Sequence, residues 1–221
     1  MELQEQLRDI KSRFRMAMNG VASKSMRDKG LCYKVNFGIE LPRLREIAAC
    51  YEKDHRLAQT LWKEPVRESK ILAGMLQPVE SFIPELADIW IDEMPYPEIA
   101  ELTCMNLFQY LPYASDKVFQ WIADERPYSQ ACGYLVLTRL FAKGLQLNER
   151  AEGEYLDQAL STIQSAKAFP QRAAFTSLLH YVRLGKQQGQ RTLKILAGLN
   201  TPEKPEWQSL YEEIKAETEM W

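Results

Sequence analysis

The stretch that decides the fold runs from Phe37 to Leu76 and reads FGIELPRLREIAACYEKDHRLAQTLWKEPVRESKILAGML. Its apolar residues recur at spacings of three and four, as they do along one face of an α-helix. We interpret the stretch as a loop followed by three closely spaced amphipathic helices, at 41–52, 55–63 and 66–77. These helices carry a row of lysine and arginine residues. The alternation of apolar and polar residues typical of a strand is absent.

The same helical periodicity continues over nearly the whole chain. Four prolines each stand where a long apolar helix begins, a position where the missing N–H costs nothing: Pro65, Pro97, Pro127 and Pro170. Each long helix follows a shorter one, which predicts stacked helix pairs. The further helices are expected at 2–18, 21–29, 83–92, 97–111, 116–124, 128–143, 150–165, 170–184, 188–198 and 203–219.

Two fold hypotheses fit this pattern. The first is an all-α solenoid of about six helix pairs, and the second is an irregular helical bundle. The predicted helix at 128–143 is apolar nearly all round, so it must be covered on several sides, which a layer inside a solenoid provides. No linker rich in glycine and serine interrupts the chain, so we expect a single domain spanning 1–221.

Composition narrows the class of protein. Apolar residues make up 46% and charged residues 26% of the 221, which is ordinary for a soluble globular protein. The first residues are charged, unlike a signal peptide, and no apolar run approaches the length of a membrane span. Four widely spaced cysteines, without a C-x-x-C pair, argue against a zinc site or a disulfide scaffold. We therefore expect a cytoplasmic protein without a metal or a membrane association.

The net charge of −2 conceals an uneven distribution. Residues 1–75 carry a balance of +5, residues 76–125 a balance of −9, and residues 126–221 a balance of +2. A protein that binds duplex DNA needs several cations on one face, because they displace counterions from the phosphates. The first third of the chain could supply them. The acidic middle would repel DNA unless its carboxylates point away from it.

Three motifs in the opening stretch resemble a known family. They are G-I-x-x-P-x-L-R-x-I-A from Gly38, L-A-x-x-L-W from Leu57 and R-E-x-K-x-L-A from Arg67. The chain is similar to a divergent member of the DNA alkylation repair family (AlkD-like, with HEAT-like repeats), specifically over its first third. Members of that family are HEAT-like α-solenoids, and the characterised enzymes excise alkylated purines. The resemblance implies a right-handed HEAT-like α-α superhelix whose longer helices line the concave face.

The resemblance also implies a catalytic residue. In active members the helix corresponding to 97–111 carries a W-x-x-x-D pattern, whose Asp stabilises the positive charge that develops on the sugar and positions a water molecule. Alignment through residues 105–108 places Glu101 at the Asp position and Pro97 at the Trp position. From the residues alone, Glu101 shares a helical stripe with Cys104, Met105 and Phe108. A carboxylate in such a place more often lies at the edge of the stripe and reaches solvent.

Further along the chain, the family's DNA contacts are replaced or partly matched. Ser129-Gln130 stands where the family has a pair of arginines, one of which reaches a phosphate. Arg172-Ala173 echoes the start of the last family element, without the Trp that follows it there. The basic residues of the first third could be phosphate contacts, or solvated helix faces paired with nearby glutamates. The candidate DNA-binding residues are Arg43, Arg45, Arg67, Lys70, Gln130 and Arg172.

Aromatic and histidine side chains offer little else. We expect Trp62, Trp90 and Trp121 to be core residues and Trp207 and Trp221 to be partly exposed. His55, beside Asp54, is more typical of a helix-cap neighbour than of a catalytic base. No G-x-S-x-G, P-loop or H-E-x-x-H motif occurs.

Two functions remain open at this point. The first is a divergent DNA alkylation repair protein that binds duplex DNA and acts as a glycosylase on N3- or N7-alkylated purines. Such a base is already cationic, so one carboxylate could stabilise the sugar cation without a cofactor. The alternative is a non-catalytic helical-repeat scaffold that binds a protein or another nucleic-acid structure. The replaced Trp and Arg positions favour the alternative, and the sequence leaves open whether the chain is an enzyme.

Overall fold

The computed structural model describes residues 2–199 and 205–220, and this part of the chain is helical. It contains thirteen α-helices and three short 3-10 helices, and the only extended pairing within it is an isolated bridge between Val35 and Val66. Each predicted helix has a counterpart, so the all-α prediction is confirmed. None of the helices in the two described ranges has the length and apolar composition that crossing a bilayer requires.

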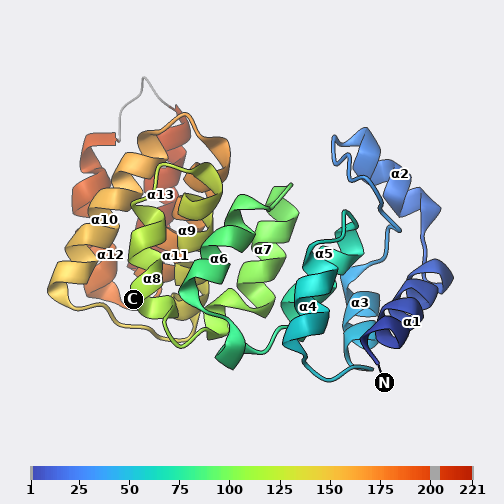
Figure 1. Cartoon of the computed structure of the whole chain (residues 1–221). Coiled ribbons are helices and arrows are strands. Elements are labelled where there is room, and N and C mark those ends of the chain that lie inside the picture. Colours follow the sequence, from blue (N-terminus) through green and yellow to red (C-terminus); the bar gives the residue numbers. More distant parts are fainter. Residues whose placement is uncertain (1, 200–204, 221) are drawn as a thin grey trace. The chain divides into compact units, whose positions relative to one another are not determined.

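The chain divides into two compact units, residues 1–112 and residues 113–221. Each is described by itself, and the single domain over 1–221 stays a prediction. The first unit contains two 3-10 turns, η1 (Val79–Ser81) and η2 (Phe108–Tyr110). Its α-helices, coloured blue to green in Figure 1, are α1 (Leu3–Met16), α2 (Gly20–Asp28), α3 (Leu41–Ala48), α4 (His55–Trp62), α5 (Arg67–Leu76), α6 (Pro84–Asp92) and α7 (Pro97–Asn106).

Helix α5 lies at the centre of the first unit and contacts α3, α4 and α7. The core includes stacked indoles: the ring centroids of Trp62 and Trp90 are 3.9 Å apart, with the planes nearly parallel. Phe82 packs edge-on against Trp90. Both tryptophans are fully buried, which confirms that they are core residues. Stacked and edge-on aromatic pairs are a favourable way to fill the space between successive helix pairs.

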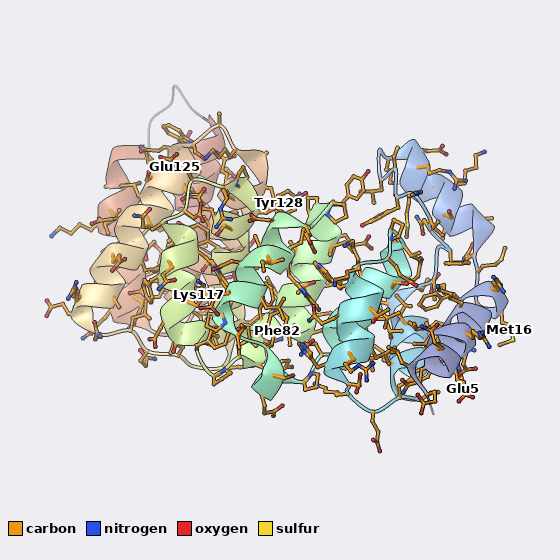
Figure 2. The ribbon with its side chains drawn as sticks, in the orientation of Figure 1. Glu5, Met16, Phe82, Lys117, Glu125 and Tyr128 are labelled. Atoms are coloured by element: carbon orange, nitrogen blue, oxygen red, sulfur yellow. The ribbon has the colours of Figure 1, made fainter. Side chains whose placement is uncertain are left out.

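Helix α2 is set apart from the other helices of its unit (Figure 1). Only Ser23 of α2 is buried, and Met16 at the end of α1 projects into solvent (Figure 2). The anchor of α2 is a tight turn at Gly38, which has φ +69°. A Cβ there would lie 2.3 Å from the carbonyl oxygen of Asn19, so only glycine allows this close approach.

Helix α7 is shorter than the predicted helix at 97–111. It ends at Asn106, and Leu107 leaves the helical region, with φ −131° and ψ −63°. Residues 108–110 then form η2, and Leu111 is extended, as a residue before a proline prefers to be. Phe108 is therefore not on the same helical stripe as Glu101. Pro65 also lies outside its helix, one residue before the N-cap Val66 of α5.

The second unit consists of three further helix pairs. Its helices are α8 (Ala114–Ile122), α9 (Pro127–Ala142), α10 (Glu149–Gln164), α11 (Ala168–Val182), α12 (Lys186–Leu196) and α13 (Pro205–Glu219), with one 3-10 turn, η3 (Ala197–Leu199). Helix α9 is covered by α8 and α11, as its all-round apolar surface predicted. At Gly133 of α9 a Cβ would lie 2.6 Å from Ile122 Cγ2 of α8, so glycine permits these two helices to approach closely.

One polar contact recurs in three helix pairs. In each, a side chain in the second helix donates a hydrogen bond to a backbone carbonyl eight residues earlier, at the end of the first helix. Lys70 Nζ donates to Trp62 O at 2.8 Å, Gln130 Nε2 to Ile122 O at 3.2 Å, and Gln171 Nε2 to Ile163 O at 2.6 Å. Carbonyls at a helix C-terminus lack partners within the helix. The three side chains therefore occupy equivalent positions in a structural repeat with little shared sequence.

Candidate functional site

The loop between α2 and α3 is held in place by a buried carboxylate. Glu68 on α5 is completely buried, and its two oxygens accept hydrogen bonds from the backbone N–H groups of Phe37, at 3.1 Å, and Ile39, at 3.2 Å. A buried charge needs partners of this kind. The R-E-x-K motif thus fixes the backbone of residues 37–39 onto the first turn of α5.

The neighbouring Arg67 joins this carboxylate to α7. Its guanidinium makes two hydrogen bonds to Glu98, Nε to Oε2 at 2.9 Å and Nη2 to Oε1 at 2.5 Å. Nη1 donates to Glu68 and to the carbonyl of Ile39, both at 3.0 Å. Burial opposes the charge of Arg67, but Glu98 and Glu68 outweigh it, so the pKa of Arg67 is raised. Sequence analysis predicted a phosphate contact here; the structure shows a 4% exposed residue whose donors are occupied inside the unit.

Glu98 is a residue that sequence analysis missed. Its Oε2 also accepts a hydrogen bond from the hydroxyl of Tyr33, at 3.0 Å, so it links α7 to the loop as well as to α5. Burial, followed by the charge of Glu98, raises the pKa of Tyr33. One signal could have found Glu98. It lies 31 residues after Arg67, and Trp62 and Glu93, which are hydrogen-bonded at 2.7 Å, have the same separation.

Next to this network, with Tyr33 common to both, the first unit contains a cavity of about 250 Å³. Its walls are residues 32–34 of the loop, residues 65–66 before α5, residues 95–96 before α7, and Lys70. Tyr33 and Tyr96 meet edge to face with their ring centroids 4.6 Å apart. The hydroxyl of Tyr96 accepts a hydrogen bond from the backbone N–H of Cys32 at 2.9 Å. Both aromatic walls are therefore fixed by hydrogen bonds at their hydroxyl ends.

The predicted catalytic carboxylate lies elsewhere, on the surface of α7. Glu101 is exposed and makes no hydrogen bond or ion pair within the described residues. Met105 follows it by one helical turn, on the same face of α7. Nη2 of Arg45, on α3, lies 4.0 Å from the sulfur of Met105, on α7. Helix α5 contacts both α3 and α7. The fold thus brings Arg45 and Glu101 to the same face of the α3–α5–α7 layer.

The other cations predicted to contact DNA in this unit differ in availability. Arg43 is exposed and pairs with Glu46 on its own helix. Lys70 is half-buried, with Nζ 4.4 Å from the centre of the Trp62 ring, and burial lowers its pKa. Arg45 is exposed and has no carboxylate partner in the described ranges. Among the predicted contacts of the first unit, Arg45 is therefore the one whose charge is most available to a phosphate.

In the second unit, the predicted contacts Gln130 and Arg172 lie on different helices. Gln130 lies in the first turn of α9, and its Nε2 donates a hydrogen bond to Ile122 O at the end of α8. Arg172 is exposed on α11 and borders a cavity of about 260 Å³ between α10, α11 and α13. Trp207 of α13 lines the same cavity and is half-buried, as expected of this residue; Trp221 lies outside the described residues. A tryptophan from another helix therefore lies near Arg172 in space, although none follows Arg172 within α11.

Comparisons with known proteins agree with this architecture. Residues 10–152 match the sequence profile of the family described as DNA alkylation repair enzyme. A search among curated protein sequences finds no significant match. A solved structure, described as a new family of proteins related to the HEAT-like repeat DNA glycosylases with affinity for branched DNA structures, superposes with a TM-score of 0.75. It is 15% identical, and the match covers 89% of this chain and 83% of that chain.

The structural match confirms the HEAT-like helical-repeat fold, in preference to an irregular bundle. The family profile spans both the α5–α7 network and the α8–α9 pair, well over half of the chain. The chain belongs to the DNA alkylation repair enzyme family.

Proposed function

We propose that this protein binds DNA and excises N3- or N7-alkylated purines, with Glu101 as the catalytic carboxylate and no cofactor. One observation carries the proposal: Glu101 is an exposed, unpaired carboxylate among the described residues, on the same face as the available cation Arg45. The buried or half-buried carboxylates Glu68 and Glu98, by contrast, have partners within the fold. An exposed acid on the same face as a cation that is available to a phosphate suits a group that meets a DNA sugar.

Excision of an already cationic base requires only one stabilising carboxylate from the protein. When the bond between the sugar C1′ and the purine nitrogen breaks, its electron pair neutralises the cationic base. The sugar becomes an oxocarbenium ion, which the Glu101 carboxylate stabilises electrostatically. Water then adds to C1′ and releases a proton to the solvent. Because Glu is one methylene longer than Asp and a displacement of about 1 Å can cost 100-fold in rate, we expect slow turnover.

Release of 7-methylguanine or 3-methyladenine from methylated duplex DNA tests catalysis. Glu101→Gln removes the charge and keeps the shape, so it should abolish release while leaving DNA affinity and Tm nearly unchanged. Glu85→Gln is the matched control, because Glu85 is an exposed carboxylate on the neighbouring α6. Equal release by wild type and Glu101→Gln would reject Glu101 as the catalytic residue.

DNA binding is tested separately, through Arg45. Arg45→Ala should weaken binding to every sequence and lower the salt dependence by about one ion, as loss of one phosphate contact does. Arg56→Ala is the control, because Arg56 is an exposed arginine on α4.

Arg43 and Arg172, also exposed, should add smaller contributions. Gln130 should matter only through its second amide N–H and Lys70 only through its two remaining N–H groups, since one N–H of each already holds a helix carbonyl. Arg67 would have to leave its network to reach DNA.

A second function is favoured by a specific observation. The acidic balance of −9 over residues 76–125 and the engagement of Arg67 inside the unit weaken the case for gripping a standard duplex. A non-catalytic protein that binds branched DNA, or a protein partner, fits these features, and the structural neighbour is described as having affinity for branched DNA. Tighter binding to a three-way junction than to a duplex, without base release, would select it. The four cysteines form no disulfide in the described part of the chain, which suits a reducing, cytoplasmic location in either case.

A further inference from the structure

The cavity in the first unit has a composition that points to a planar ligand. Its walls are the rings of Tyr33 and Tyr96, the rings of Pro65 and Pro95, and the exposed thiol of Cys32. Among the residues that the structure describes, no carboxylate lines it. Its volume of about 250 Å³ lies just below the roughly 300–1,000 Å³ of pockets for drug-sized ligands. The space suits one flat ring system, and the absence of acid in the wall disfavours a cation.

The walls are already in place without a ligand. Glu98 fixes the hydroxyl of Tyr33, and the N–H of Cys32 fixes the hydroxyl of Tyr96. The buried pair Arg67–Glu98 holds Glu98 in turn. A pocket whose rings are held before binding loses little conformational entropy when a ring system stacks there.

Two lysines give the cavity a positive rim. Lys34 is exposed and has no ion pair in the described part of the chain. The ammonium of Lys70 has three N–H donors, of which one is used by the carbonyl of Trp62. Aromatic walls with cations at the edge are the combination by which proteins hold unpaired nucleotides, because every base has a π-face and every nucleotide a phosphate.

We propose that this cavity takes one unpaired nucleobase of DNA, with its phosphate on Lys34. The inference rests on the DNA binding proposed above and adds a site for an extrahelical or single-stranded nucleotide. It requires neither Glu101 nor base excision, so it holds for the glycosylase and for the non-catalytic protein alike.

The thiol of Cys32 provides a direct readout. Cys104 and Cys132 are buried, so in a Cys50→Ser background Cys32 is the one exposed thiol. Its rate of modification by a disulfide reagent is measured with saturating amounts of a duplex, or of the same duplex with one extra unpaired dT. We expect the unpaired dT to slow modification of Cys32 at least about fivefold, and the fully paired duplex to leave the rate nearly unchanged. Equal rates with the two DNAs would overturn the proposal.

Filling the cavity gives an independent test. Cys32→Tyr places a ring where the base would sit, whereas Cys50→Tyr adds the same ring to an exposed position at the end of α3. Circular dichroism checks that both variants fold. Stacking on an aromatic ring is worth a factor of about 5 to 100 in affinity per base. Cys32→Tyr should remove a preference of that size for the DNA with the unpaired dT and leave duplex affinity unchanged, while Cys50→Tyr should keep the preference.

The outcomes separate the two proposals. If the wild type binds both DNAs with equal affinity, and both leave Cys32 equally reactive, DNA binding stands and the cavity site is rejected. If it binds neither DNA at any salt concentration, the proposed function fails and the cavity site fails with it.

Discussion

The two compact units solve the same packing problem with different polar chemistry. Both tie the end of one helix to the start of the next through an equivalent side chain, Lys70 in the first unit and Gln130 in the second. The first unit then buries charges, Arg67 and Glu68, to connect its helices. The second unit buries mainly neutral tyrosine hydroxyls, with one carboxylate, Glu152, that pairs with the exposed Arg191.

The tyrosine cluster occupies the core between α9, α10 and α11. The ring centroids of Tyr155 lie 5.3 Å from those of Tyr181 and 5.2 Å from those of Phe141. The hydroxyl of Tyr155 donates to Ser177 at 3.0 Å, and that of Tyr181 to Glu152. A neutral hydroxyl needs a single partner when it is buried, whereas a buried ion needs several.

The difference indicates that the charged network of the first unit does more than stabilise the fold. A charged network is an expensive way to join helices, and replacing such a network by apolar residues is often neutral for stability. In the first unit it also positions the loop with Tyr33 and the wall of the cavity. The second unit needs only a core there. We therefore expect the first unit to be more sensitive to the loss of a single polar side chain.

Breaking the charged network should have the largest effect. Arg67→Met leaves the carboxylates of Glu68 and Glu98 without their shared cation, and removing one partner of a buried pair costs about 3–5 kcal/mol of unfolding free energy. Urea denaturation of the whole chain measures it. Arg56→Met, at an exposed position on α4, is the matched control and should change little. If the free energy of unfolding fell by less than about 1 kcal/mol, the network would contribute no more than an ordinary surface ion pair.

A close helix contact of the second unit should come next. Gly133→Ala brings a Cβ to 2.6 Å from Ile122 Cγ2 and 2.9 Å from its backbone nitrogen, so α8 and α9 must separate. Overpacking of this kind costs about 1–3 kcal/mol. Gly153→Ala is the control, because its Cβ would meet no atom within 4 Å and alanine favours a helix. Thermal unfolding should show a lower Tm for the first variant only.

A neutral hydroxyl of the second unit should matter less. Tyr155→Phe keeps the ring and removes the hydrogen bond to Ser177, which costs about 1 kcal/mol. Denaturant titration of this variant beside Arg67→Met tests the comparison directly. If Tyr155→Phe proved as damaging as Arg67→Met, the contrast between charged and neutral networks would fail.

The smallest effect concerns an exposed ion pair before α9. Hydrogen bonding from Arg126 lowers the pKa of Asp124 from its ordinary 3.8 to about 2. A lowered folded-state pKa contributes stability above pH 3.8 that is lost as pH falls toward 2. The pair is partly solvated, so the change should be slight. NMR titration of the Asp124 carboxyl should show its pKa rise toward 3.8 in Arg126→Ala; an unchanged pKa would contradict the assignment.

Much of the fold followed from periodicity because a helix is decided by neighbours three and four residues apart. The helices His55–Trp62 and Arg67–Leu76 appear where the apolar pattern placed them. The length of α7 did not follow, since its apolar pattern continues past Asn106 while the backbone leaves the helix at Leu107. The buried state of Trp62 was predicted, but its stacking on Trp90 was not.

The candidate site was predictable in its residue types and not in its arrangement. Within the motif R-E-x-K, the sequence marked Arg67 and Lys70, but as cations that would contact phosphate. In the structure both cations also hold the fold together, Arg67 by an ion pair to Glu98 and Lys70 by a hydrogen bond to a helix carbonyl. Glu101 as the catalytic residue stays a prediction, with its exposure in keeping with that role.

The sequence by itself determined the helical class, the core tryptophans and the family, because these depend on local spacing and on residue types along one segment. Only the tertiary structure decided which cations remain available and which aromatic rings meet. Arg45 reaches Met105, and Tyr33 meets Tyr96, across separations of 60 or more residues. Such contacts depend on how helix pairs stack, and the free energy of stacking comes from the whole buried surface. No short motif records it.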